Sequence, residues 1–229
     1  MSAKKTVLVT GGSGFIGKAI ALALHQAGHQ VIITDLIPSP WGTDLPAGMR
    51  AYQLDLMARS YRETLEEIGQ FEVLVNCAGV FLNRTNLASY SSEDLELIVG
   101  VNVHAPFRLA QETLSLCKKQ ILQGVINIGS LAADMQGRDF YYGLSKRNLR
   151  DLTRRAAAEQ PYLTYYCLEP GLVRDSPAFL ALTADERAAW VVKPGGIVAL
   201  HQITRAILHC IDGTSGMKSG EHRPVTAFS

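Results

Sequence analysis

The stretch VTGGSGFIGKAI, Val9 to Ile20, places four glycines within seven residues at the beginning of the chain. The apolar run that leads into it, residues 5–10, predicts a buried β-strand, and FIGKAIALALHQAG predicts a helix that ends at Gly28. Glycine costs conformational entropy in regular structure, so four of them between a strand and a helix indicate a special turn.

The glycine spacing fits two forms of a phosphate-binding loop. G-x-G-x-x-G is met by Gly12, Gly14 and Gly17, and G-x-x-G-x-x-G by Gly11, Gly14 and Gly17. Without Cβ atoms the turn can be tight, and a pyrophosphate can approach the backbone. The helix N-terminus then offers free N–H groups to the phosphates. The stretch therefore predicts a dinucleotide-binding βαβ unit.

An acidic residue ends the next predicted strand, QVIITD. Asp35 lies 18 residues after Gly17. A carboxylate there can accept hydrogen bonds from both ribose hydroxyls of NAD, and it would repel the 2′-phosphate of NADP. We therefore expect NAD to be the cofactor.

The rest of the chain alternates between strand and helix patterns. Further strands are predicted at residues 49–56, 71–79, 124–130 and 163–171, and helices at residues 58–69, 91–120, 141–160 and 196–211. Apolar strands separated by helices indicate an α/β fold, a doubly wound, mostly parallel sheet with helices on both faces. No linker divides residues 1–229, so we expect one domain. Its one long irregular segment, at about 171–195, is a candidate substrate lid.

Composition excludes several classes of function. The chain has 229 residues, of which 47% are hydrophobic and 19% charged, and its net charge is +1. We therefore expect neither a nucleic-acid partner nor a membrane partner. Cys77, Cys117, Cys167 and Cys210 lie far apart, so no metal site is expected. The N-terminus does not have the pattern of a secretory signal, and we expect a cytoplasmic protein.

Polar side chains that can carry redox chemistry follow the predicted fifth strand. Ser130 ends that strand, and Tyr142 and Lys146 are four residues apart, so they share a helix face. The Lys146 ammonium would favour the Tyr142 phenolate and lower the phenol's pKa. Tyr142 can then exchange a proton with an alcohol or carbonyl while hydride passes to or from a nicotinamide, and Ser130 can hold the substrate oxygen. Asn102 could hold a water that links Lys146 to solvent.

This assignment predicts a pH dependence. Oxidation of an alcohol needs Tyr142 deprotonated, so we expect its rate to rise from about pH 7 to 9 as the phenol titrates. Carbonyl reduction needs the protonated phenol, and we expect its rate to fall over the same range.

Together these motifs resemble the short-chain dehydrogenase/reductase family. The resemblance runs from Lys5 to about Asp212, and it rests on these features: TGGSGFIG, Asp35, Asp55-Leu56, NCAG at residues 76–79, Asn102, Ser130, YGLSK and Pro170-Gly171. It implies a catalytic tetrad of Asn102, Ser130, Tyr142 and Lys146. It also implies a homodimer or homotetramer built on the helices that carry Asn102 and Tyr142.

The resemblance implies a set of cofactor-binding residues, with Asp55 and Leu56 beside the adenine and Lys146 also on the nicotinamide ribose. The set is Gly11, Ser13, Gly14, Phe15, Ile16, Gly17, Asp35, Leu36, Asp55, Leu56, Asn76, Ala78, Gly79, Tyr142, Lys146, Pro170, Gly171 and Val173. The expected function is NAD-dependent interconversion of a small secondary alcohol and its ketone.

Some features depart from the common family pattern. The glycine spacing is more usual in the nucleotide-sugar branch, so an epimerase or dehydratase is an alternative, and a non-catalytic dinucleotide sensor is another. Asp175 stands where a threonine often contacts the nicotinamide carboxamide; Ser176 is the other candidate for that contact. The C-terminal SGEHRPVTAFS matches the family's last strand only weakly.

Overall fold

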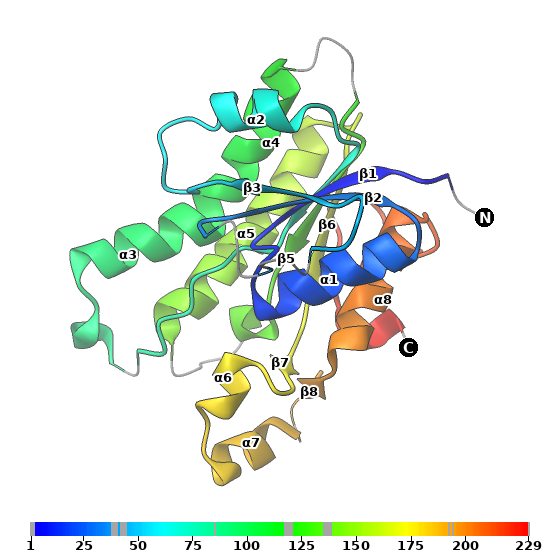
Figure 1. The fold of residues 1–229 in the computed structure, drawn as a ribbon. Coiled ribbons are helices and arrows are strands. Elements are labelled where there is room, and N and C mark those ends of the chain that lie inside the picture. The colour runs from blue at the N-terminus through cyan, green and yellow to red at the C-terminus, as the bar shows by residue number, and fades with distance from the viewer. Residues whose placement is uncertain are drawn as a thin grey trace.

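The computed structural model describes residues 3–37, 41, 45–84, 86–116, 121–134, 139–191, 193 and 195–228. Its centre is a seven-stranded sheet with the order β3-β2-β1-β4-β5-β6-β9, and every pairing in it is parallel (Figure 1). The strands are β1 (Thr6–Thr10), β2 (Gln30–Asp35), β3 (Arg50–Gln53), β4 (Val73–Asn76), β5 (Gly124–Ile128), β6 (Thr164–Glu169) and β9 (His222–Pro224). The predicted α/β class, with one doubly wound domain, is confirmed.

The α-helices are α1 (Phe15–Gln26), α2 (Arg62–Ile68), α3 (Ser92–Val99), α4 (Ala105–Leu116), α5 (Phe140–Glu159), α6 (Pro177–Leu180), α7 (Ala184–Val191) and α8 (Leu200–Ile211), and helices cover both faces of the sheet. Helices α1 and α8 pack together on one face, while α2 and α4 contact each other on the opposite face, to which α5 also contributes (Figure 1).

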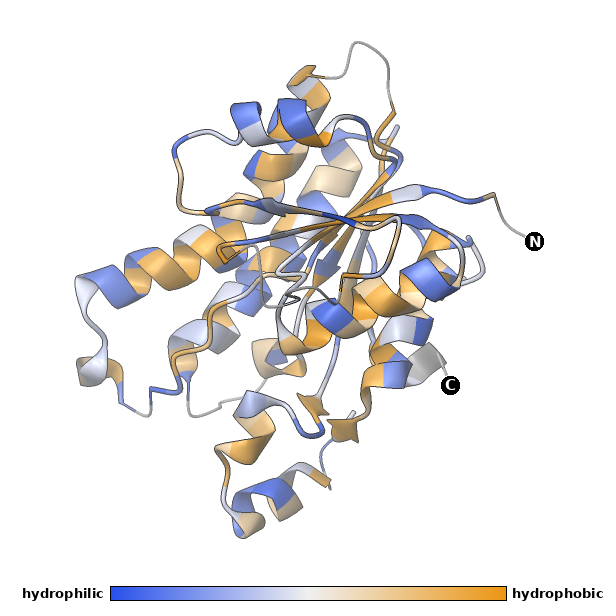
Figure 2. Ribbon diagram, viewed as in Figure 1, coloured by the Kyte–Doolittle hydropathy of each residue, from blue (hydrophilic) through white to orange (hydrophobic). Residues whose placement is uncertain are grey.

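Alternate strand residues feed two separate cores. Val7 and Val9 of β1 point into the core beneath α1 and α8, whereas Leu8 between them points into the core beneath α2 and α4. This period-two alternation is expected of a strand buried on both faces. Figure 2 shows hydrophobic colour along the central strands and alternating hydrophobic and hydrophilic bands along the helices.

The predicted long helix at 91–120 is interrupted by a π-helical turn, η3 (Gly100–His104), between α3 and α4. Pro106 has no N–H to donate to the carbonyl of Asn102 four residues earlier, and its ring would clash with that carbonyl in a regular α-helix. A wider π turn relieves this conflict. It also places Asn102 in the irregular turn. Residues 117–120 of the predicted helix lie outside the described residues.

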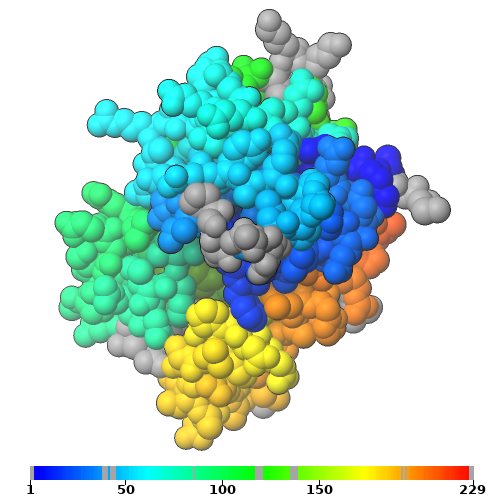
Figure 3. Space-filling view, viewed as in Figure 1, coloured from blue at the N-terminus to red at the C-terminus, as the bar shows by residue number. Residues whose placement is uncertain are grey.

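Two segments are more ordered than the sequence indicated. The candidate lid contains α6 and α7, and its two ends pair as a short parallel ladder of β7 (Leu172–Val173) and β8 (Ile197–Val198). In the space-filling view this segment, coloured yellow, forms one end of the molecule (Figure 3). Near the C-terminus, β9 pairs with β6 from Cys167 to Glu169, so the weakly indicated last strand is present.

Candidate active site

A cavity of about 910 Å³ lies at the carboxyl ends of β1, β2, β4, β5 and β6. The strand order reverses between β1 and β4, and such a switch point is where doubly wound sheets form ligand sites. The volume is within the range of small-molecule sites. Most residues that were predicted to bind a cofactor line this cavity.

The glycine loop forms one wall, through Gly11, Gly14, Phe15, Ile16 and Gly17. Gly11 adopts a φ of +63°, in the left-handed region. A Cβ built on Gly17 would lie 2.0 Å from the Gly11 carbonyl oxygen, so the loop closes on the first turn of α1 and admits no side chain there. Gly14 is the N-cap of α1 without a side-chain cap, which leaves the helix N-terminus open toward the cavity.

Asp35 both lines the cavity and supports the loop. Its carboxylate accepts hydrogen bonds from the backbone N–H groups of Ser13, at 3.0 Å, and Leu36, at 2.8 Å. Ser13 itself does not line the cavity. Its contribution to the site is the backbone N–H that it donates to Asp35.

The adjoining wall comes from Leu36, Asp55 and Leu56. Asp55 is oriented by the N–H of Met57, which donates to its carboxylate at 2.8 Å. The structure thus brings Asp35, Leu36, Asp55 and Leu56 to one end of the cavity.

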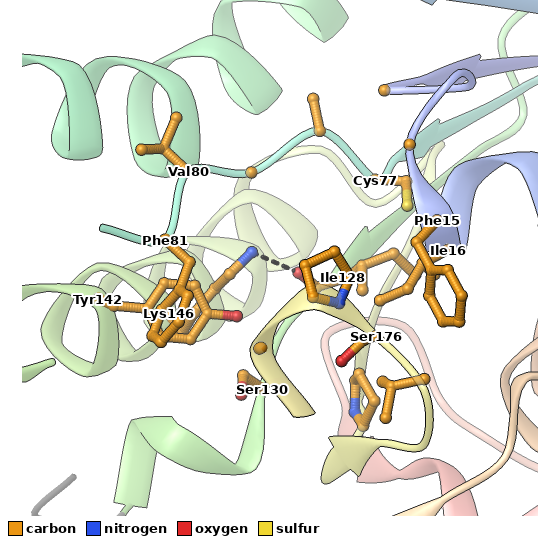
Figure 4. A pocket seen from close by; sticks show the side chains of 18 of the residues that line it. Phe15, Ile16, Cys77, Val80, Phe81, Ile128, Ser130, Tyr142, Lys146 and Ser176 are labelled. Atoms are coloured by element: carbon orange, nitrogen blue, oxygen red, sulfur yellow. Dashed lines mark hydrogen bonds between the residues drawn. The ribbon is translucent and has the colours of Figure 1, made fainter. Parts of the chain in front are cut away.

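Tyr142 and Lys146 reach the cavity from α5, and Ser130 reaches it from the segment after β5 (Figure 4). The Lys146 ammonium is buried and donates to the Ile128 carbonyl at 2.9 Å. Burial lowers the pKa of Lys146 below its usual value. The side chains of Tyr142 and Ser130 both line the cavity, and Ser130 acts on the phenol by lowering its pKa, so two hydroxyls lie on the wall beside an ammonium.

The expected direction of the Tyr142 pKa shift is wrong for this structure. Burial raises the pKa of Tyr142 to about 12; the interaction with the Ser130 side chain lowers it, and the nearby charge of Asp139 raises it further. The lysine does not offset the burial, because its Nζ lies 5.7 Å from the Tyr142 ring centroid and donates to Ile128 instead of the phenol. The cost of burying the charged phenolate away from water is therefore the largest effect on the pKa of Tyr142, and it raises that pKa.

Asn102 lies next to this group but does not line the cavity. Its amide oxygen accepts from the Val80 N–H at 2.7 Å, and its amide nitrogen donates to the Val80 carbonyl and to the Ser145 hydroxyl. A Cβ added to Gly79 would lie 3.3 Å from the Lys146 Nζ and 3.5 Å from the Asn102 oxygen. Asn102 therefore joins the loop after β4 to α5, directly behind the Lys146 ammonium.

The loop after β4 contributes Ala78 and Gly79 to the cavity wall, but not Asn76. The Asn76 side chain is buried below the wall and donates to Asn127 at 2.8 Å and to the Pro106 carbonyl at 3.4 Å. Its place is in the polar interior that links β4, β5 and α4.

Past β6, Pro170, Gly171 and Val173 line the cavity as expected. Of the two candidates that follow, Ser176 is buried on the wall, whereas Asp175 is exposed and has a φ of +63°. Ser176 also caps α6 by accepting from the Phe179 N–H at 3.1 Å. The left-handed backbone at Asp175 turns the chain so that Ser176 faces inward (Figure 4).

A comparison with protein families identifies the family of this chain. Residues 5–187 match the model for short chain dehydrogenases. The chain belongs to the short-chain dehydrogenase family.

Relatives and solved structures of this family resemble the chain over most of its length. It is 30% identical over 172 residues to an uncharacterized oxidoreductase of Thermotoga maritima, which covers 70% of this chain and 67% of the relative. It is 30% identical over 191 residues to the 3-oxoacyl-[acyl-carrier-protein] reductase MabA of Mycobacterium tuberculosis, with 80% and 74% covered.

Two solved structures show the extent of the shared fold. A 4-hydroxyisoleucine dehydrogenase complexed with NADH has a TM-score of 0.85 at 20% identity, with 96% of each chain covered. A blue fluorescent protein from a metagenomic library, in complex with NADPH, has a TM-score of 0.81 at 26% identity, again with 96% of each chain covered.

Sequence reasoning missed two features of the site in this short-chain dehydrogenase. Asp139 lines the cavity and caps α5 beside Tyr142; an acidic residue three positions before the tyrosine was a usable N-cap signal. Trp41 is buried against the glycine loop, where its indole N–H donates to the Gly12 carbonyl at 3.2 Å. Its flanking sequence has no periodic pattern that could have indicated this position.

Within the part of the chain that the structure describes, no helix is long and apolar enough to cross a membrane. Among the same residues, no group of three or more histidine, cysteine, aspartate or glutamate side chains is arranged to hold a metal ion. Cys117 lies outside the described residues, and Cys77, Cys167 and Cys210 are free thiols.

Proposed function

We propose that the chain is an NAD-dependent oxidoreductase that interconverts a small secondary alcohol and its ketone. One observation carries this proposal: the hydroxyls of Tyr142 and Ser130 lie on the cavity wall beside the buried Lys146 ammonium. Two hydroxyls at one point can hold a substrate oxygen and exchange its proton. Membership of a dehydrogenase family supports the same chemistry.

The cavity fits a nicotinamide dinucleotide. Gly11 and Gly14 present bare backbone at the open N-terminus of α1, which suits a pyrophosphate. At the far end, the Asp35 carboxylate suits ribose hydroxyls and would repel a 2′-phosphate, so we propose NAD over NADP. Solved structures of similar fold carry NADH in one case and NADPH in another, so the fold accepts both cofactors. The support for NAD over NADP is therefore the Asp35 carboxylate.

The bound nicotinamide would supply hydride transfer to or from the substrate carbon. Ser130 would hold the substrate oxygen, and Tyr142 would take its proton in oxidation or return it in reduction. Lys146 would supply positive charge that favours the phenolate and would bind the nicotinamide ribose. Asn102, whose side chain already holds the Val80 backbone, would keep the wall in place behind Lys146.

The lid would cover the substrate. Ala178, Leu182, Ala189 and Trp190 from the α6–α7 segment line the cavity, and Phe81 lines it from the loop after β4. These walls are largely apolar, so they suit a substrate whose carbon skeleton is apolar around the reacting alcohol.

We also propose that the chain forms a homodimer or homotetramer through α4 and α5. The support is an exposed apolar stripe on α5, formed by Phe140, Leu144 and Leu152, which follow one another at helical spacing. Sedimentation equilibrium of the full chain tests this, and a Leu144→Glu variant should dissociate the assembly.

Initial-rate assays test the function. The full chain is incubated with NAD and a panel of secondary alcohols, and NADH formation is followed by absorbance. Turnover that disappears in Tyr142→Phe supports the proposal. NAD binding without turnover of any alcohol or ketone would instead support a non-catalytic dinucleotide sensor.

A further inference from the structure

The buried carboxylate of Asp139 collects hydrogen bonds from three separate parts of the chain. It is only 5% exposed and stands at the N-terminus of α5, where its Oδ1 accepts from the Tyr142 N–H at 2.9 Å. The same oxygen accepts from the Tyr90 hydroxyl. Its Oδ2 accepts from the backbone N–H groups of Leu82, at 3.2 Å, and Asn83, at 3.0 Å.

The loop held by Asp139 forms the cavity wall next to Tyr142. Phe81 and Asn83 line the cavity, and the Phe81 ring meets the Tyr142 ring edge-on with centroids 5.1 Å apart (Figure 4). Asn83 has a φ of +55°, which is unfavourable for a residue with a side chain. The hydrogen bond from its N–H to Asp139 helps to stabilise this conformation.

Tyr90 completes the arrangement. Burial raises the pKa of Tyr90 above its usual range, and the hydrogen bond to Asp139 adds to that effect, so the hydroxyl remains a donor. Its ring contacts Tyr141, the neighbour of Tyr142, with centroids 4.8 Å apart. Arg84, whose charge acts on Tyr90 in the opposite direction, forms an ion pair with Asp94, at 3.0 Å.

We propose that Asp139 is a positioning residue, which holds the Phe81–Asn83 wall against Tyr142 and acts through its carboxylate on the charge of the phenol. This inference rests on the proposed function for its catalytic consequence, whereas the holding role stands on the contacts alone. Asp139 thus determines where a substrate lies relative to the proton-transferring hydroxyl.

The charge acts together with the other groups around Tyr142. Burial and the charge of Asp139 raise the pKa of Tyr142, while the interaction with the Ser130 side chain lowers it. Lys146 lies across the ring on the same helix. Removal of the Asp139 charge should therefore move the titration of Tyr142 to lower pH.

Asp139→Asn tests both roles because it keeps the size of the side chain. A carboxamide has one oxygen and one NH₂ group, so in either orientation its NH₂ faces backbone N–H groups that Asp139 now accepts from. Turning the oxygen toward Tyr142 preserves the helix cap, because asparagine is also a good N-cap, but breaks the bonds to Leu82 and Asn83.

Hydrogen exchange followed by mass spectrometry measures the holding role without any turnover. In Asp139→Asn, we expect peptides covering residues 80–84 to exchange roughly 10- to 100-fold faster, since charged hydrogen bonds are lost. The central strands should exchange as in the wild type. Tyr90→Phe, which removes one donor and keeps the charge, should show a smaller increase in the same peptides. Asp151→Asn, at an exposed position on the same helix, is the matched control and should change nothing.

Kinetics measure the catalytic consequence. In Asp139→Asn, kcat/KM should fall by about 10- to 100-fold through misplacement of the wall. The rise of the oxidation rate with pH should also move to lower pH, whereas in Tyr90→Phe it should stay at the wild-type position. A purely structural residue would not shift the pH profile.

The two proposals fail in different ways. If the wild type turns over no alcohol or ketone, the proposed function fails, and exchange at residues 80–84 alone decides the holding role. Wild-type exchange at residues 80–84 in Asp139→Asn would overturn the holding role. Faster exchange spread over the whole chain with a collapsed melting temperature would also overturn it, because the effect would then be global. An unshifted pH profile in an active Asp139→Asn enzyme would overturn the electrostatic role.

Discussion

Replacement of Gly17 by alanine should damage the glycine loop far more than replacement of its neighbour Gly14. A Cβ at residue 17 would lie 2.0 Å from the Gly11 carbonyl oxygen, whereas ordinary contact begins at 3.4 Å, so the two atoms must separate by about 1.4 Å. Gly11 cannot retreat easily, because a Cβ on it would already lie 2.7 Å from the Ala78 backbone.

The cost follows from this geometry. Overpacking typically destabilises by 1–3 kcal/mol, and a clash with backbone on both sides places Gly17→Ala at about 3 kcal/mol. For a domain of this size, each kcal/mol lowers the melting temperature by about 2–4 °C, which predicts a fall of about 6–12 °C. In Gly14→Ala the nearest atom is at 3.3 Å and φ is −73°, so the melting temperature should stay within about 2 °C of the wild type.

Thermal melts with and without NAD measure both effects. NAD at about 100 times its Kd should stabilise the wild type by about 2.7 kcal/mol, or about 5–11 °C. Gly17→Ala should lose most of this shift, since the displaced loop no longer presents its backbone to the phosphates. A Gly17→Ala protein that melts within about 2 °C of the wild type and keeps the full NAD shift would refute the close-packing argument.

Three further predictions concern the proposed site. Tyr142→Phe should lower kcat by about 10²–10⁴-fold while NAD affinity, measured by calorimetry, stays nearly unchanged; substantial residual turnover would remove Tyr142 from the proton-transfer role. Burial raises the pKa of Tyr142 to about 12, so the phenolate fraction and the initial rate of oxidation should rise with pH without a plateau between about pH 7 and 9. Over that range the rate of reduction should stay flat, because the phenol remains protonated, and the fall that the sequence predicted is therefore not expected. A deuterium isotope effect must confirm that chemistry limits both rates. NADP should bind roughly 10- to 1,000-fold more weakly than NAD, as repulsion from one carboxylate implies. In paired titrations, Asp35→Asn should reduce the ratio of the NADP and NAD dissociation constants. Tighter binding of NADP to the wild type would contradict the role given to Asp35.

The sequence by itself determined the first six strands of the central sheet and the helices between them, in their order. A strand buried on both faces needs a continuous apolar run, and a helix that covers a sheet needs an apolar stripe, so both patterns are visible within ten or fifteen residues. The glycine loop is equally local, because the close approach of Gly17 to Gly11 involves residues six apart. Tyr142 and Lys146 are placed together by one turn of α5.

The tertiary structure decided how residues distant in sequence act on these local motifs. Asp139 meets Tyr90 and Asn83 across 49 and 56 residues, and Asn102 meets Val80 and Ser145 across 22 and 43, and no periodic pattern encodes such pairs. Strand β9, of three residues, forms only because β6 offers its free edge.

The pKa of Tyr142 shows the same division most clearly. Its neighbour Lys146 is visible in the sequence and argues for a lowered pKa, but burial by residues from several elements raises it instead. Charge is a property of a residue and can be read from the chain, whereas desolvation depends on everything packed around that residue, so only the folded structure determines which of the two effects is larger.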